Sequence, residues 1–207
     1  MAKKIKKVVV REDYLAKLLK IDVSKYKYRI LSIDPGKTNM GISCLGVKAD
    51  DTLVVLANAV ICRPFTELKA GFMQSLNTCL AEIDNWVKCY TPHCISMERY
   101  MNRKIGGDSA EVVSILIGAI SYKYQMPTKL LNAAVWKNAF HSRFVDSKLE
   151  EIYKYSKTTP HAIDAILQGC YALELALQRP LNYTPDSIVA MAEATSLTKL
   201  INRQSRL

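Results

Sequence analysis

The sequence predicts an α/β fold in which helices flank a mixed β-sheet. Two observations support this prediction. Three strand-like runs follow one another closely between residues 29 and 62, and helical patterns then alternate with two further short strands. The 207 residues suffice for one domain with a sizeable core and extensions.

The early strands are indicated by their apolar side chains. They are expected at Arg29–Asp34, Met40–Val47 and Leu53–Cys62. Ile and Leu are frequent in the first of these runs, and Val and Leu in the last. Because the connections between the runs are short, we expect them to pair as antiparallel neighbours.

The hydrophobic period changes after the third strand. Between residues 65 and 90 apolar residues recur three or four positions apart, which predicts a long amphipathic helix before a fourth strand at Cys94–Glu98. A Gly-Gly-Asp sequence then precedes a largely apolar helix at Ser109–Tyr124. We expect that helix to be buried in the core or at a subunit interface.

The rest of the chain is predicted to be mainly helical. The expected elements are, in order, a strand at Thr128–Leu131 and helices at Ala133–Phe140, Ser147–Tyr155, Pro160–Gln178 and within Pro185–Leu207. We divide the chain into a basic N-terminal extension at 1–28, a domain at 29–180 and a helical tail at 181–207.

The chain is strongly basic. Its net charge of +10 favours a polyanionic partner, although charge alone does not separate nucleic acid from anionic lipid. The six cysteines show no Cys-x-x-Cys spacing, so we expect neither a zinc site nor a disulfide framework. The lysine-rich start excludes a secretory signal, and no apolar run approaches the ~18 residues of a membrane span. We therefore expect an intracellular, cytoplasmic protein without a membrane partner.

Four polar residues stand at the ends of predicted elements. Asp34 ends the first strand before a Pro-Gly turn, and Glu98 ends the fourth strand. His161 and Asp164 lie three positions apart at the start of a helix, so they point to the same side. Hydrolysis of a phosphodiester with two magnesium ions needs a carboxylate able to bridge both ions and further carboxylates or imidazole to complete each shell, and these residues supply such a set.

Each of these residues taken alone also has a structural explanation. Asp34 suits a turn before Pro-Gly, and Glu98 could pair with a following arginine at the surface. His161 and Asp164 suit the first turn of a helix, where the dipole favours an acid. Only their combination, in this order among these elements, favours a catalytic site.

The same motifs resemble those of the RuvC-type Holliday junction resolvases, within the RNase H-like superfamily. The resemblance covers roughly residues 29 to 178. It is carried by Ser32-Ile33-Asp34-Pro35-Gly36 with Thr38 and Gly41, Ser96-Met97-Glu98, Asp108-Ser109-Ala110 and His161-Ala162-Ile163-Asp164-Ala165. It implies an RNase H-like mixed sheet, with three antiparallel strands followed by parallel ones.

By this resemblance, Asp34, Glu98, His161 and Asp164 are the catalytic residues and bind two Mg²⁺ ions, for which Mn²⁺ would substitute. Asp34 would bridge the two ions. Many members carry aspartate where this chain has His161, so the site has one negative charge fewer and gains a titratable base. His161 could bind a metal or accept a proton from the attacking water.

The resemblance also implies contacts to DNA. Lys137 and Lys148 match lysines that lie near the phosphate backbone, although the usual Gly-containing connection between them is replaced here by residues 141–146. After Glu98, one of Tyr100 and Met101 could enter the centre of a junction and stack on a base. The flanking residues expected on phosphates are Arg99, Arg103 and Lys104.

The function expected from these residues is a magnesium-dependent endonuclease that resolves four-way DNA junctions. Because a junction is two-fold symmetric, we expect a homodimer with the helix at 109–124 as its seam. An actin-like ATPase, which shares the Asp-x-Gly-x-Thr pattern, needs two large domains, so we expect no nucleotide cofactor. Nucleases for flaps, forks or RNA:DNA hybrids stay open, as does a module that binds branched nucleic acid without cutting.

Overall fold

The computed structural model describes residues 21–62, 71–99, 108–144, 152–153 and 160–197. The elements are η1 (Val23–Lys25), β1 (Tyr28–Asp34), β2 (Asn39–Val47), β3 (Leu53–Cys62), α2 (Phe72–Tyr90), β4 (Cys94–Glu98), α3 (Asp108–Tyr124), β5 (Thr128–Leu131), α4 (Ala133–Arg143), α6 (Pro160–Leu177) and α7 (Pro185–Ala194).

The sheet has the predicted mixed architecture. Its five strands are ordered β3-β2-β1-β4-β5. The first three strands pair antiparallel as two hairpins, whereas β4 is parallel to β1 and β5 is parallel to β4. The α/β, RNase H-like prediction is therefore confirmed.

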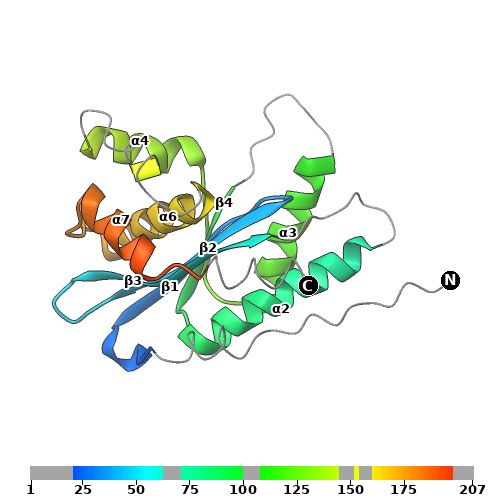
Figure 1. Ribbon diagram of the computed structural model, residues 1–207, viewed down its shortest axis with the longest axis horizontal. Helices are drawn as coiled ribbons and strands as arrows, with labels where there is room; N and C mark the ends of the chain where they lie inside the picture. Colours follow the sequence, from blue (N-terminus) through cyan, green and yellow to red (C-terminus); the bar gives the residue numbers. More distant parts are fainter. Residues whose placement is uncertain (1–20, 63–70, 100–107, 145–151, 154–159, 198–207) are drawn as a thin grey trace.

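Helices cover both faces of this sheet (Figure 1). Helices α2 and α3 pack on one face, where their buried side chains meet Leu31, Ile33, Ile95 and Met97 of β1 and β4. Helices α4, α6 and α7 pack on the other face together with Ile30. Because successive strand residues point to opposite faces, β1 and β4 contribute to both cores.

Helix boundaries differ from the sequence prediction where long-range contacts act. Helix α4 continues three residues beyond Phe140, and the Arg143 guanidinium at its end donates to both carboxylate oxygens of Glu174 at 2.7 and 2.9 Å. The first part of the helix predicted from residue 65 and most of the helix predicted at 147–155 lie outside the described residues. Of the latter, Ile152 and Tyr153 are helical.

The predicted C-terminal helix is realised as α7. Thr184 and Ser187 form a reciprocal capping box at its start, and Pro185 occupies the first turn. The buried amide of Asn58 on β3 donates to the Ala192 carbonyl at 2.8 Å, which fixes α7 to the sheet. None of the helices in the described ranges is long and apolar enough to cross a membrane.

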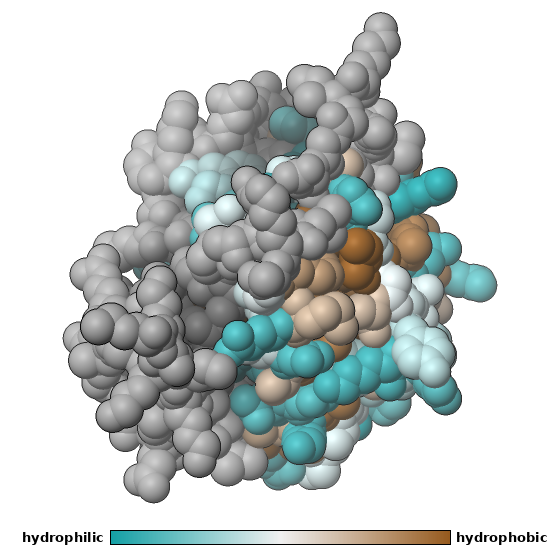
Figure 2. All heavy atoms as spheres, turned by 90° about the vertical axis from the view of Figure 1, so that its right-hand side faces the viewer, coloured by the Kyte–Doolittle hydropathy of each residue, from teal (hydrophilic) through white to brown (hydrophobic). Residues whose placement is uncertain are grey.

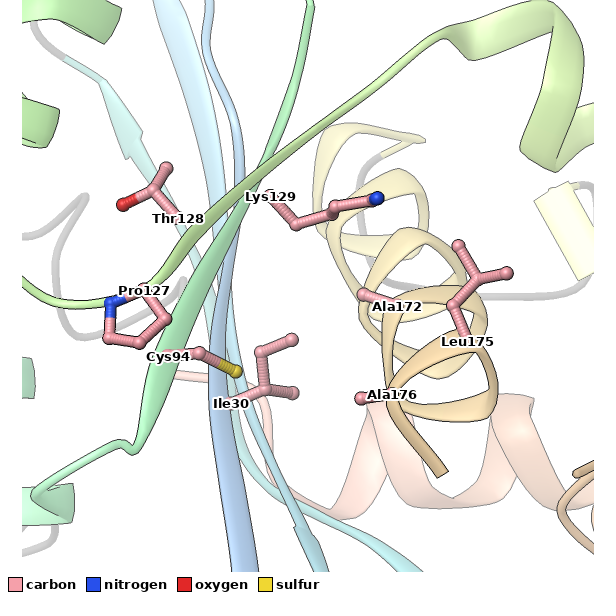
Figure 3. A pocket seen from close by; sticks show the side chains of 8 residues that line it. All are labelled: Ile30, Cys94, Pro127, Thr128, Lys129, Ala172, Leu175 and Ala176. Carbon is pink, nitrogen blue, oxygen red and sulfur yellow. The ribbon is translucent and has the colours of Figure 1, made fainter. Parts of the chain in front are cut away.

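A cavity of about 280 Å³ separates the second half of α6 from the β5 edge of the sheet (Figure 3). Ile30 and Cys94 line it from the amino ends of β1 and β4, and Leu175 lines it from α6. Most of the lining is apolar, and Lys129 supplies the one charged group among the described residues that line it. The cavity therefore lies at the opposite end of the parallel strands from Asp34 and Glu98.

Candidate active site

The parallel pairing of β1 with β4 brings Asp34 and Glu98 together. Ile33 is the register partner of Met97, so the residue that follows each of them lies at the same carboxyl-terminal end of the two parallel strands. Asp34 is the last residue of β1 and Glu98 the last of β4. The two carboxylates thus share one end of two adjacent strands.

The start of α6 lies against the same end of the sheet. The Nδ1 of His161 is 2.8 Å from Asp34 Oδ2. This contact depends on Gly41 of β2, because a Cβ atom there would lie 1.9 Å from the His161 carbonyl oxygen. A residue without a side chain therefore allows the strand and helix backbones to touch beside the site.

Asp164 is held by two side chains from other segments. Lys137 of α4 places its Nζ 3.1 Å from Asp164 Oδ2, and that ammonium also lies 4.9 Å from the centre of the Trp136 ring. The hydroxyl of Tyr153 donates to the other carboxylate oxygen. The side chain of Asp164 is only 16% exposed, so both of its partners act in a partly water-excluded setting.

The electrostatics of the site reflect burial first and the nearness of other charged groups second. Burial, and then the neighbouring Asp34 carboxylate, raise the pKa of Glu98 to about 7, while Lys137 opposes the rise. Burial also raises the pKa of Asp164, against the hydrogen bond from Tyr153. The hydrogen bond to Asp34 raises the pKa of His161, which favours the charged imidazolium.

The structure brings together all four predicted catalytic residues and Lys137. Arg99 is exposed directly after Glu98, and its backbone N–H donates to the Leu131 carbonyl at 2.7 Å. Tyr100, Met101, Arg103, Lys104 and Lys148 lie outside the described residues. Sequence reasoning missed Tyr153, because its contact with Asp164 joins two segments and leaves no local pattern.

The carboxylate oxygens and the imidazole nitrogen of this cluster are atoms of the types that bind divalent cations. Carboxylate oxygens suit Mg²⁺ and Mn²⁺, whereas imidazole is a ligand more typical of Zn²⁺ and Fe²⁺. Burial and then the repulsion from Asp34 raise the pKa of Glu98, and a bound cation would favour its charged form. In their present positions, however, the described side chains include no group of three or more His, Cys, Asp or Glu placed to hold one ion. His161 and Lys137 instead serve as partners of Asp34 and Asp164.

Comparison with solved structures shows which known fold this chain shares. The chain is similar to RuvC of Thermus thermophilus in complex with a Holliday junction substrate, with 16% sequence identity and a TM-score of 0.57 over 72% of this chain and 96% of RuvC. A second Thermus thermophilus RuvC structure matches with 14% identity and a TM-score of 0.55 over 74% of this chain and 98% of that protein. The fold is therefore RuvC-like.

Comparison at the level of sequence gives no match. No protein-family model matches the chain. No curated protein matches it either.

Proposed function

We propose that this protein is a metal-dependent endonuclease that resolves four-way DNA junctions. The observation that carries the proposal is the meeting of Asp34, Glu98, His161 and Asp164 at one end of β1, β4 and α6, in a RuvC-like fold. The net charge of +10 supports a polyanionic substrate. The similar RuvC of Thermus thermophilus forms a complex with a Holliday junction substrate.

The carboxylates would hold the catalytic metal. Asp34, Glu98 and Asp164 would together hold two Mg²⁺ ions, or Mn²⁺ in their place. When bound, such ions stabilise the attacking and leaving oxygens of phosphodiester hydrolysis. A set of desolvated, mutually repelling carboxylates is otherwise a cost to a protein that binds phosphates.

His161 and Lys137 have roles that follow from their contacts. His161 contacts Asp34 through Nδ1, so in the neutral ring with its proton on Nδ1 the other nitrogen would be the atom able to take a proton from water. Because the hydrogen bond to Asp34 raises the pKa of His161, this neutral form gains weight as the pH rises. Its side chain is 43% exposed, so water reaches it. Lys137 is 37% exposed beside Asp164 and would contact a phosphate oxygen of the bound strand.

Paired cutting of a symmetric junction would come from a homodimer. Helix α3 buries Val112, Leu116 and Ile120 in the core but leaves apolar surface outside, with Ile115 36% and Tyr122 81% exposed. Figure 2 shows apolar residues gathered in a band on the side of the molecule where α2 and α3 lie. We infer that this face, and α3 in particular, forms the seam between two copies.

A second candidate is a protein that binds branched nucleic acid without cutting it. It is favoured by the internal pairing of Asp34 with His161 and of Asp164 with Lys137. These pairs neutralise carboxylates that a nuclease would offer to cations. The two candidates differ in a single measurable property, cleavage in the presence of magnesium.

The test is incubation of the protein with a labelled immobile four-way junction, a duplex, a flap and an RNA:DNA hybrid, each with magnesium or with EDTA. Symmetric paired nicks on the junction, lost with EDTA and in Asp34→Asn, would support the resolvase. Cutting of flaps or hybrids, without cutting of the junction, would support a nuclease that acts on a different substrate. Binding of the junction without any cutting would favour the second candidate.

A further inference from the structure

A buried polar layer lies directly beneath the acidic cluster. Ser32 and Ser96 stand two residues before Asp34 and Glu98 on their strands, so all four side chains point to the face covered by α6. The two serines are register partners and are fully buried. The Ser96 hydroxyl donates to the Ser32 Oγ at 2.9 Å, which joins β1 and β4 beyond their backbone bonds.

Gln168 of α6 completes this layer. It lies four residues after Asp164, one helical turn further along the same side of the helix. Its Nε2 is 3.3 Å from each of Ser32 Oγ, Ser96 Oγ and the Ile33 carbonyl oxygen. One amide from the helix therefore reaches both strands that carry the catalytic carboxylates.

The helix is seated closely at this point. A Cβ atom on Gly169 would lie 2.9 Å from Ser32 Cβ and 2.6 Å from Leu45 Cδ1. The contact of Gly41 with the His161 carbonyl makes a second close approach near the start of the helix. These two contacts seat α6 closely against β1 and β2, and they leave its exact register to the polar side chains that lie between them.

Stability alone does not account for Gln168. The side chain is 0% exposed, its three hydrogen bonds are long, and its Oε1 has no partner among the described residues. An unsatisfied buried amide oxygen is destabilising, so an apolar residue of the same length would suit this core better. Its neighbours along α6, including Ile163, Ile166 and Leu167, are indeed apolar and buried.

We propose that Gln168 is a positioning residue, which with Ser32 and Ser96 sets α6 in register with β1 and β4 so that Asp164 and His161 meet Asp34 and Glu98. The inference rests on the proposed nuclease function. A shift of α6 by one residue would move its side chains by about 1.5 Å along the helix axis and turn them by about 100°. Misplacement on that scale lowers catalysis by about 10²-fold.

The test compares Gln168→Leu with Asn58→Leu. Asn58 is a matched control because it is also a fully buried amide on the same face, with an orphan Oδ1, but it holds α7 rather than α6. The measurements are kcat and KM for a four-way junction with magnesium, junction binding in EDTA, and the midpoint of thermal unfolding.

We expect Gln168→Leu to lower kcat by about 10- to 100-fold, with KM and binding in EDTA changed less than about twofold because phosphate contacts are untouched. Asn58→Leu should keep kcat at the wild-type value, whatever its unfolding midpoint. Ser96→Ala should lower kcat in the same direction. The double variant with Gln168→Leu should lose less than the product of the two single losses, because both residues act in one network.

Wild-type kcat in folded Gln168→Leu would overturn the inference and leave the proposed nuclease intact. If that variant fails to fold, wild-type kcat in Ser96→Ala would overturn it instead. An equal loss of kcat in Asn58→Leu would show a general effect of core polarity and would also overturn it. A wild-type protein that cuts no branched substrate would overturn the proposed function, and the role of Gln168 with it.

Discussion

The two faces of the central sheet use the same strands for different purposes. Between Ile30 and Asp34, the side chains that face α2 and α3 are Leu31 and Ile33, whereas Ser32 and Asp34 face α6. Strand β4 repeats the pattern, with Ile95 and Met97 on one side and Ser96 and Glu98 on the other. Toward their carboxyl ends, the two strands are therefore apolar on the α2 and α3 face, whereas on the α6 face they carry polar groups that end in the candidate site.

This difference indicates which strand residues contribute mainly to the stability of the fold and which contribute mainly to the candidate site. On the α2 and α3 face, strand residues contribute by burial, at about 1.5–3 kcal/mol for a large apolar side chain. On the α6 face, buried polar groups are costly unless bonded, so their retention indicates a task other than packing. Substitutions on the two faces should therefore fail in different ways.

The sharpest contrast is between Asp34→Asn and Leu31→Ala, which lie on the same strand. Asp34→Asn keeps the size of the side chain and should lower cleavage by about 10³-fold or more with the fold intact. Leu31→Ala should reduce the free energy of unfolding by about 2–5 kcal/mol, because it leaves a cavity, but should retain kcat while folded. Single-turnover cleavage and urea unfolding of both variants measure this. A folded Leu31→Ala protein as inactive as Asp34→Asn would break the comparison.

The next effect concerns two glycines. Gly41→Ala should lower both activity and stability, the latter by roughly 1–3 kcal/mol, because the new methyl group would push against the backbone of His161. A Cβ atom on Gly118 in α3 would meet no atom of the same chain within 4 Å outside its own helix backbone, so Gly118→Ala should stabilise the helix by about 0.5–1 kcal/mol. Thermal unfolding and kcat of the two variants test this comparison. A Gly41→Ala protein with wild-type stability and wild-type kcat would contradict the close approach of α6.

A smaller effect is expected from lysines on opposite sides of the sheet. Lys137→Ala should weaken junction binding and reduce the slope of log K against log salt by about 1, since one phosphate contact is lost. Lys123, which pairs with Asp84 at 2.6 Å on the α3 side, is the control, and Lys123→Ala should leave the slope unchanged. Titrations of labelled junction at several salt concentrations give both slopes. Equal slopes for wild type and Lys137→Ala would remove Lys137 from the interface.

The smallest expected effect is a pH dependence of the free energy of unfolding, caused by burial of the Glu98 carboxyl group. The pKa of Glu98 is higher in the folded chain than its ordinary value of 4.5, at about 7, so the folded state holds this proton more tightly. Stability should therefore fall as the pH rises from about 4.5 to about 7. Urea unfolding in EDTA should show a weaker fall for Glu98→Gln than for wild type. The same slope in both proteins would mean that Glu98 is not desolvated.

Much of the fold was predictable because its signals are local. The strands Leu53–Cys62, Cys94–Glu98 and Thr128–Leu131 match the structure, since apolar runs bounded by breaks mark them. The end of α4 was missed because Arg143 is held by Glu174 from α6, a contact with no local pattern.

The residues of the candidate site also divide into those with a local signal in the sequence and those without one. Asp34, Glu98, His161 and Asp164 could be singled out because each stands at the end of an element, where carboxylates from different segments can meet. Two residues around them could not be found so easily, because Tyr153 and Gln168 look like ordinary helical residues in the sequence. Only the folded structure shows that Tyr153 contacts Asp164 and that Gln168 contacts the strands β1 and β4.

The contact between Asp34 and His161 joins residues 127 positions apart in the chain. During synthesis the strands that carry Asp34 and Glu98 are made first, and α6 leaves the ribosome much later. A nascent chain that ends before residue 160 holds two of the four acidic-site residues and cannot form the site. Because contacts between residues so far apart in the chain form slowly, the site would assemble only late in folding, after α6 has been made.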